Sequence, residues 1–147
     1  MPPEIAFVIC TRPDLRQEWL GASRIELFDT SNGKIEPGTK YHCYHGDALF
    51  PFEIVDWVPG EYMTGRYNLA HGVTMFETNE ITQVGEGSLV KLRFTVPTSP
   101  KLLGKFFAKT YAKQIGELLK TDKENRIARM NAIADKLDLG SDVTVAA

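Results

Sequence analysis

Residues 41–45 have side chains that could bind a metal, because two histidines and a cysteine stand within five positions. Side chains alternate between the two faces of a strand, so Cys43 and His45 would share one face, while His42 and Tyr44 would share the other. A structural zinc site needs four ligands, and no third or fourth ligand stands nearby in the sequence. We therefore expect no metal. Two interpretations stay open: one of these histidines or tyrosines donates a hydrogen bond to a ligand carbonyl, or all five are ordinary sheet residues.

Glu77 and Asn79 are the polar residues whose placement matters most, because either of two alternating sets in the strand-like run 73–84 can face inward. A three-residue loop at 85–87 would turn one set inward, namely Phe76, Thr78 and Glu80. A four-residue loop or a bulge would turn in the other set, namely Met75, Glu77, Asn79 and Ile81. We favour the second set, since Met75 and Ile81 are the better core residues. Glu77 and Asn79 would then need hydrogen-bond partners or a polar ligand, and the alternative is that both are solvated.

Other chemical signatures are weak. No serine–histidine–acid order, phosphate-binding glycine loop or paired-carboxylate spacing stands out, and the glycines at 85–87 read as a hairpin because no helix follows them. The net charge of −2 gives no electrostatic case for nucleic acid. We expect no cofactor.

Glycine-bearing turns at nearly even spacing divide residues 23–97 into short strand-like runs, which predicts an antiparallel meander. Asn32 and Gly33 form the strongest hairpin signal, because a type I′ turn needs positive φ at both central positions. In the last run one alternating set is expected to face the core, namely Val90, Leu92, Phe94 and Val96. The predicted strands are 24–29, 39–45, 50–58, 62–70, 73–84 and 89–96.

Helices are predicted before and after these strands in the sequence. Proline and acidic residues at the start of the chain indicate two short helices, the second carrying Trp19 inward and ending at Gly21. Ser99 and Pro100 predict the beginning of a long helix, and a capping-box pattern at 121–124 predicts that it breaks and restarts. Its first part carries a broad apolar stripe that would lie across the concave face of the sheet. The stripe is Leu102, Leu103, Phe106, Phe107, Tyr111, Ile115, Leu118 and Leu119.

The composition bounds the class of protein. A chain of 147 residues, 43% hydrophobic and 24% charged, fits one domain with a real core, which we place at residues 1–140, followed by a flexible tail at 141–147. No basic stretch leads into a long apolar run, and no window approaches a membrane span, so we expect a cytoplasmic protein without stable membrane insertion. Cys10 and Cys43 either form a disulfide or stay free; buried free thiols are favoured.

Three segments resemble a known family. Residues 3–7, followed by 11–14 and Trp19, resemble the proline-to-aspartate-to-tryptophan pattern with which the family begins. Residues 55–59 resemble a strand that ends in valine-x-tryptophan-x-proline. Residues 85–90 resemble a glycine-rich hairpin before an alternating strand. In this order they resemble the SRPBCC superfamily, which includes START lipid-transfer domains and polyketide cyclases. The resemblance implies an α+β helix-grip fold: two short helices, a six-stranded curved antiparallel sheet and a long C-terminal helix packed across it.

One departure from the family is that only Met1 and Pro2 precede the first helix, where the family has a full β-strand. Either the chain is a fragment of a longer polypeptide or the domain is built without that strand. A missing strand would leave a sheet edge with unpaired backbone groups, which invites a homodimer, an upstream domain or covering by the tail.

The resemblance also implies a cavity between the curved sheet and the long helix, and with it the binding of a hydrophobic or amphipathic small molecule, lipid-like or polyketide-like. Two alternatives stay open. One is a co-chaperone-like interaction domain with a filled core, docking through a second helical stripe from Ile127 to Leu137. The other is a polyketide cyclase or dehydratase using Glu77, His42 or Tyr111 as acid or base. The expected lining of the cavity is His42, Tyr44, Tyr67, Met75, Glu77, Asn79, Leu92, Phe94, Phe107 and Tyr111.

Overall fold

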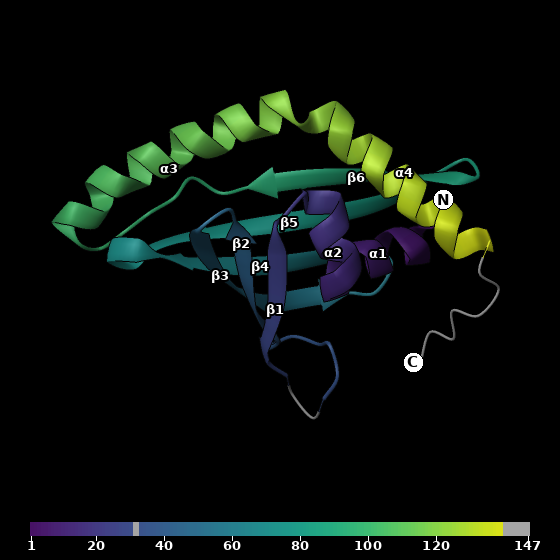
Figure 1. Cartoon of the computed structure of the whole chain (residues 1–147), viewed down its shortest axis with the longest axis horizontal. Helices are drawn as coiled ribbons and strands as arrows, with labels where there is room; N and C mark the ends of the chain where they lie inside the picture. Colours follow the sequence, from purple (N-terminus) through teal and green to yellow (C-terminus); the bar gives the residue numbers. More distant parts are fainter. Residues whose placement is uncertain (31–32, 140–147) are drawn as a thin grey trace.

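The computed structural model describes residues 1–30 and 33–139 and confirms the α+β prediction (Figure 1). Asn32, half of the predicted hairpin signal, and the predicted tail at 141–147 lie outside the described residues. Two short helices, α1 (Pro3–Thr11) and α2 (Pro13–Leu20), come first, and α3 (Leu102–Thr121) and α4 (Lys123–Leu139) come last. Between them lie β1 (Arg24–Asp29), β2 (Lys40–His45), β3 (Ala48–Val58), β4 (Tyr62–Leu69), the short 3-10 helix η1 (Ala70–Gly72), β5 (Val73–Val84) and β6 (Gly87–Phe94).

The six strands form one antiparallel meander in which every strand pairs with its neighbours in sequence, so β1 and β6 are the two edges. The turn between β3 and β4 follows the predicted chemistry, because Gly60 takes the left-handed conformation with φ of 80°. Cross-strand pairs then line up the inward residues of successive strands. One such row joins Gly65 to Glu77 and Glu77 to Phe94.

The favoured face of β5 is the buried one, but the loop that sets it differs from the loop predicted. Val84 pairs with Gly87 and Ile81 pairs with Val90, so the β5–β6 loop has two residues rather than four. Loops of two and four residues give the same alternation, which is why the inward set was correct although the loop length was wrong. Met75, Glu77, Asn79 and Ile81 are all buried.

Val96 departs from the prediction. β6 ends at Phe94, and Val96 is 76% exposed in the segment that leads to α3. The chain leaves the sheet there because the pairing continues only through the Thr95 N–H, which donates to the Phe76 carbonyl, and through an isolated bridge between Thr74 and Thr98. Beyond Phe94 the strand alternation therefore no longer decides which side chains are buried.

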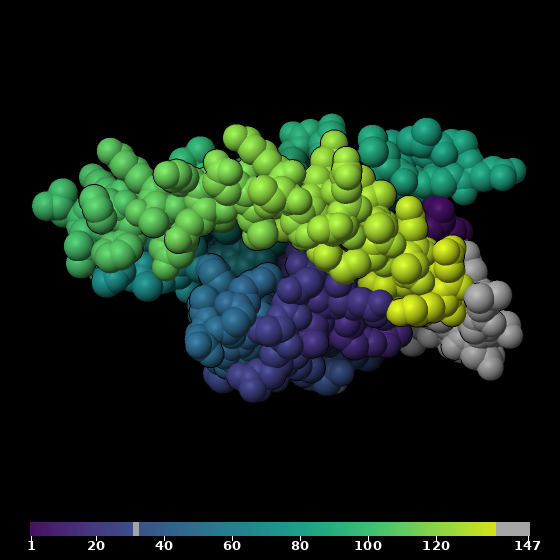
Figure 2. Space-filling view, turned by 45° about the horizontal axis from the view of Figure 1, so that its top comes forward, coloured from purple at the N-terminus to yellow at the C-terminus, as the bar shows by residue number. Residues whose placement is uncertain are grey.

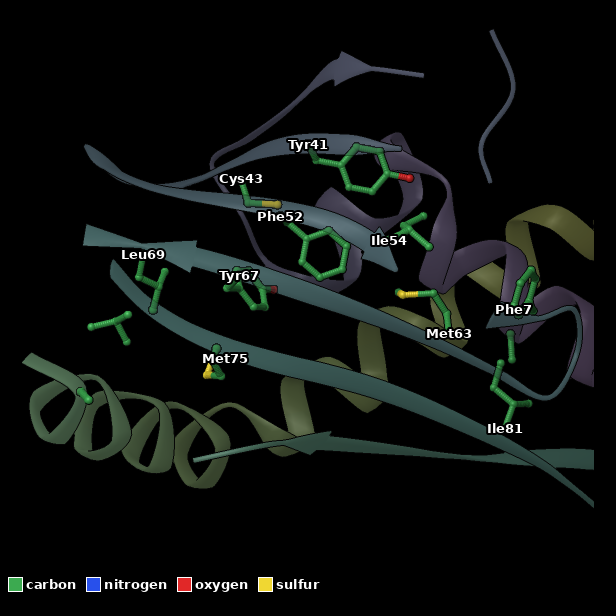
Figure 3. Packing of buried hydrophobic residues seen from close by; sticks show 13 residues of the cluster. Phe7, Tyr41, Cys43, Phe52, Ile54, Met63, Tyr67, Leu69, Met75 and Ile81 are labelled. Carbon is green, nitrogen blue, oxygen red and sulfur yellow. The ribbon is translucent and has the colours of Figure 1, made fainter. Parts of the chain in front are cut away.

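Two apolar clusters hold the molecule together. The first lies on the inner face of the sheet, where aromatic and aliphatic side chains from β2 to β5 point toward one another, together with Phe7 of α1 (Figure 3). The second lies between α1, α2 and α4 and includes Trp19, which faces inward as predicted. α4 thereby packs against the two N-terminal helices.

This second cluster contradicts the proposed docking surface. Met130 and Ile133 are buried against α1 and α2, and Leu137 packs against the same cluster. Of the four residues in that helical stripe, only Ile127 is largely exposed, at 53%. The stripe is therefore part of the core and does not form a free surface for a partner.

The predicted helix break is confirmed. Asp122 separates α3 from α4, with φ of −108° and ψ of 5°, and its carboxylate accepts hydrogen bonds from Arg126 and Arg129 of α4. The beginning of α3 was predicted two residues too early. It begins at Leu102, and the Ser99 hydroxyl accepts the Lys101 N–H ahead of it.

α3 lies over the sheet on small residues rather than on its whole apolar stripe. Gly104 and Ala108 are its buried positions, and a Cβ added at Gly104 would stand 2.5 Å from the His71 carbonyl oxygen. The prediction that the complete stripe is buried was wrong, since Leu102 is 87% and Phe106 is 68% exposed. Within the described residues no helix combines the length and the apolarity that crossing a bilayer requires.

Candidate functional site

The centre of the sheet's inner face holds a fully buried ion pair. Arg16 of α2 and Glu77 of β5 have no exposed side-chain surface, and Arg16 Nη2 donates to both carboxylate oxygens at 2.8 and 2.9 Å. The Tyr67 hydroxyl donates to Glu77 Oε2 at 2.6 Å, and Asn79 Nδ2 donates to Oε1 at 2.8 Å. These contacts supply the partners that burial of Glu77 demands.

Phe52 and Gly65 position the arginine. The Arg16 guanidinium carbon lies 4.4 Å above the centre of the Phe52 ring. That ring occupies the space that a side chain at Gly65 would fill, because a Cβ built there would lie within 2 Å of its Cζ atom. The absence of a side chain at Gly65 therefore lets the Phe52 ring lie close to β4, where it supports the cation.

Arg16 was absent from the predicted site, although the sequence contains a signal for it. Arg16, Trp19 and Leu20 are spaced by three and four residues, so they share one face of a helix. Since Trp19 was expected to face inward, Arg16 should have been expected there as well. A buried arginine requires an anionic partner, and Glu77 was the buried acid already predicted.

The ion pair makes Glu77 a poor general base. Burial alone would raise the pKa of its carboxyl group, but the Arg16 charge and the hydrogen bonds from Tyr67 and Asn79 outweigh burial and leave the pKa below its ordinary value. Burial, reinforced by the Glu77 charge, raises the pKa of the Tyr67 hydroxyl well above its ordinary value. Both groups thus hold their protonation states firmly at neutral pH, which fits a structural role better than proton transfer.

Cys10 and Cys43 are free and buried, as the sequence analysis favoured. Burial raises the pKa of the Cys10 thiol to about 12 and that of Cys43 to about 11. In the part of the chain that the structure describes, no three histidine, cysteine or acidic side chains gather into a group that could hold a metal.

We expect both thiols to react with Ellman's reagent about 100-fold more slowly in the folded protein than in denaturant, because the thiolate is the reactive form and neither thiol is exposed. Stopped-flow absorbance at neutral pH gives the two rates. A rapid reaction of either thiol in the folded state would contradict this placement.

The cavity implied between the sheet and α3 is almost filled. It has a volume of about 70 Å³, room for about two water molecules. Tyr67, Met75, Glu77 and Phe94 line it, as predicted. Asn79 is buried beside Glu77, and Phe107 and Tyr111 are half-buried where α3 packs against the first cluster.

His42 and Tyr44 do not belong to this cavity, and their assignment to its lining is corrected. They alternate with Tyr41 and Cys43, which are buried, and so lie on the opposite face of β2. The His42 ring stacks on Phe28 at 4.7 Å, and the Tyr44 hydroxyl donates to Glu26. The other interpretation, that these are ordinary sheet residues, holds for both.

A much larger groove lies next to the small cavity, between β6 and the junction of α3 with α4. Its volume is about 620 Å³, within the range of sites that bind small molecules. The break at Asp122 creates it, because α4 turns from the sheet toward α1 and α2 (Figure 2 shows α4 in yellow beside the teal tip of the β5–β6 hairpin). Its lining is Met1, Trp19, Ser88, Leu89, Val90, Lys91, Leu92, Leu119, Lys123, Arg126, Ile127, Met130 and Asn131.

Of the predicted lining residues, the groove contains only Leu92. Leu119 and Arg126 line both the groove and the small cavity, so the two spaces are neighbours. The sequence signal for the groove was the capping-box pattern at the helix break. That pattern fixed where the helix turns, but not which strand would lie beneath the turn.

No protein-family model matches the chain, and no curated protein matches it either. Solved structures do. A protein of unknown function from Staphylococcus aureus has a TM-score of 0.64 at 13% identity, and the match covers 92% of this chain and 90% of that one. A protein from Mesorhizobium loti has a TM-score of 0.58 at 15% identity, covering 97% of this chain and 92% of the other.

A third solved structure, the Aha1 dimer from Colwellia psychrerythraea, has a TM-score of 0.51 at 11% identity, with 82% of this chain and 84% of that one covered. At such low identities these likenesses concern the fold alone. They are consistent with a helix-grip fold, and membership of the SRPBCC superfamily stays a prediction. The chain shares its overall architecture with these proteins across most of its length.

Proposed function

We propose that this protein binds a hydrophobic or amphipathic small molecule in the groove between β6 and the α3–α4 junction. The observation that carries the proposal is the groove itself, about 620 Å³ with walls that include Val90, Leu92, Ile127 and Met130. Each square ångström of apolar ligand surface buried there would contribute roughly 25 cal/mol before the loss of ligand freedom is subtracted.

The proposed site differs from the one that the sequence analysis expected. The space directly under α3 is too small for a lipid-like or polyketide-like molecule, whereas the groove is large enough. Leu118, an apolar residue of α3 that remains exposed, stands near the C-terminal end of the helix beside the groove-lining Leu119. A ligand in the groove could therefore extend along this helix.

The two alternatives receive less support. A cyclase-like enzyme would need an accessible acid or base, but Glu77 is locked in the ion pair and His42 lies on the outer face of the sheet. The structural neighbour from Colwellia psychrerythraea is called an Aha1 dimer, but that name describes the neighbour and not this chain. The interaction-domain alternative also required a free docking surface on α4, and most of that surface is buried in the second apolar cluster.

The open edge of β6 supports a separate proposal, that a second copy or an upstream domain adds a strand there. Five consecutive residues of β6 line the groove, so its backbone edge faces that space. The mass of the protein in solution, measured by light scattering with and without dodecanol, tells a small molecule in the groove from a strand added by a second copy. A monomer of unchanged mass that binds dodecanol supports the small molecule, and a dimer that dodecanol dissociates supports strand addition.

We expect Ile127→Trp to weaken binding of the neutral fluorescent probe N-phenyl-1-naphthylamine at least tenfold, about 1.4 kcal/mol, because the larger ring takes up part of the groove and narrows it for the probe. Leu102→Trp is the matched control: it changes an exposed apolar residue at the other end of α3, away from the groove lining, and should leave the dissociation constant unchanged. Fluorescence titration measures both. Equal affinity in the two variants would place the probe elsewhere and contradict the proposal.

A further inference from the structure

We propose that the ligand of this groove is an amphipath with one apolar chain and an anionic head, carboxylate or phosphate, and that Arg126 binds the head. The inference rests on the proposed function and names the chemistry of the ligand. It follows from Arg126, from the indole N–H of Trp19 and from the lysines that line the groove together with its apolar walls.

Arg126 is the first of these groups. It is only 9% exposed and stands where the groove meets the small cavity. Its Nε donates to Asp122 Oδ2 at 3.0 Å, and within the described residues its two terminal nitrogens have no hydrogen-bond acceptor. A planar guanidinium whose two terminal NH2 groups are unoccupied can present one N–H from each to the two oxygens of a carboxylate or phosphate.

Arg129, one turn further along α4, shows what a purely structural arginine looks like here. Its Nε donates to the Trp19 carbonyl at 3.0 Å and its Nη2 donates to Asp122 at 2.7 Å. It does not line the groove. The Asp122 carboxylate is thus shared between two cations, so it cannot neutralise both, and an added anion at Arg126 would balance the charge.

Trp19 is the second observation that points to a ligand. It is 3% exposed, it lines the groove, and its indole Nε1 is buried with no acceptor among the described residues. A buried donor without a partner is unfavourable by about 1–3 kcal/mol, so a ligand oxygen in reach of it would be bound tightly.

The rest of the lining has the matching charge. Lys91 and Lys123 add two cations, and none of the aspartates or glutamates that the structure describes lines the groove, although the whole chain carries a net charge of −2. The apolar walls of β6 and α4 then receive the chain of the ligand. A trimethylammonium head offers Arg126 and Trp19 no acceptor, and a hydroxyl head offers a single uncharged oxygen where a carboxylate or phosphate offers charged ones, which is the basis of the expected discrimination.

The test is a panel of twelve-carbon probes titrated into the protein below their micellar concentrations, read by isothermal calorimetry and by the intrinsic fluorescence of its two tryptophans, Trp19 and Trp57. Dodecanoate or dodecyl phosphate should bind about tenfold or more tightly than dodecanol, and dodecyltrimethylammonium should bind most weakly. Tighter binding of the phosphate than of the carboxylate indicates a phospholipid-like head, and the reverse indicates a fatty-acid-like head. Both outcomes support an anionic ligand.

Variants test whether Arg126 causes the preference for an anionic head. Arg126→Gln should bring the ratio of dodecanoate to dodecanol affinity close to one, and Arg126→Lys should restore part of it. Lys113→Gln, which removes an exposed lysine on α3 outside the groove, is the control and should leave the ratio unchanged.

The outcomes separate this inference from the proposed function. If dodecanol and dodecanoate bind equally to the unaltered protein, the anionic head is refuted while the groove remains a binding site. If no member of the panel binds, the proposed function itself fails. The panel needs no variant, so poor folding of Arg126→Gln cannot conceal the result.

Discussion

Replacing Arg16 by methionine is expected to lower the free energy of unfolding by about 3–5 kcal/mol at neutral pH, because it leaves the Glu77 carboxylate buried without its cation. Methionine keeps most of the side-chain volume, so the loss reports the charge rather than a cavity. Urea denaturation, followed by far-ultraviolet circular dichroism, gives the free energy of unfolding and its dependence on urea.

The double variant Arg16→Met/Glu77→Gln provides the control. A glutamine amide leaves no unpaired charge in the core and can still accept the Tyr67 hydrogen bond, so the double variant should recover part of the lost stability. The two changes are therefore strongly non-additive, as expected for groups in direct contact. Additive losses would contradict the pairing.

The pH dependence has a defined sign. In the unaltered protein the folded-state pKa of Glu77 is below its ordinary value of 4.5, so the stability from the ion pair is present above that pH. It is lost as the pH falls through the lowered folded-state pKa. In Arg16→Met the remaining burial raises the pKa of Glu77, so lowering the pH should stabilise the folded variant relative to its unfolded chain. The stability gap between the two proteins should therefore narrow in acid. A gap below 1 kcal/mol at neutral pH, or one independent of pH, would contradict the ion pair.

The fold was predictable because local signals agreed with one another. Even spacing of the turns predicted the meander that the structure has. Alternation along 73–84 left two faces open, and the apolar Met75 and Ile81 favoured the one that carries Glu77 and Asn79, which is the buried face. Prediction failed where the burial of a side chain depends on residues outside its own segment. Val96 continues the alternation of β6 in sequence, but the strand ends two residues earlier, so its side chain is exposed.

The candidate site was predicted only in part, for two physical reasons. The partner of Glu77 comes from α2, 61 positions away, and no pattern within β5 announces it. The groove depends on the direction that α4 takes after Asp122, which is set by packing of Met130 and Ile133 against α1 and α2. Periodicity shows that α4 has an apolar face, but it does not show which surface that face will cover.

The assumption that an apolar helix face is always buried produced the error at α3. α3 comes close to η1 through Gly104, where any side chain would meet Ser99 and the His71 carbonyl. The helix is held close to η1 at this one glycine, and its larger apolar residues do not all reach the sheet. Leu102 and Phe106 are exposed for this reason, although their spacing is that of a core stripe.

The second large effect is expected from Gly65→Ala, which should lower the free energy of unfolding by about 3 kcal/mol through overpacking. Gly65 has no left-handed φ, so the backbone accepts alanine and the loss is steric. The added Cβ would lie 2.2 Å from Phe52 Cε2, and the ring is 2% exposed and confined by Tyr67, with ring centres 4.9 Å apart. Chemical denaturation measures the loss.

Gly116→Ala is the matched control for that variant. No atom lies within 4 Å of a Cβ at Gly116, and the residue is inside α3, so alanine there should stabilise the protein by about 0.5–1 kcal/mol. Phe52→Leu combined with Gly65→Ala should be less destabilised than the sum of the two single changes, because the smaller side chain vacates the space.

Since the Phe52 ring also supports Arg16, the overpacked variant Gly65→Ala should lose part of the ion pair, and the dependence of its stability on acid pH should shift toward that of Arg16→Met. If Gly65→Ala is destabilised but keeps the pH dependence of the unaltered protein, then the ring moves without displacing the arginine, and the two contacts are independent.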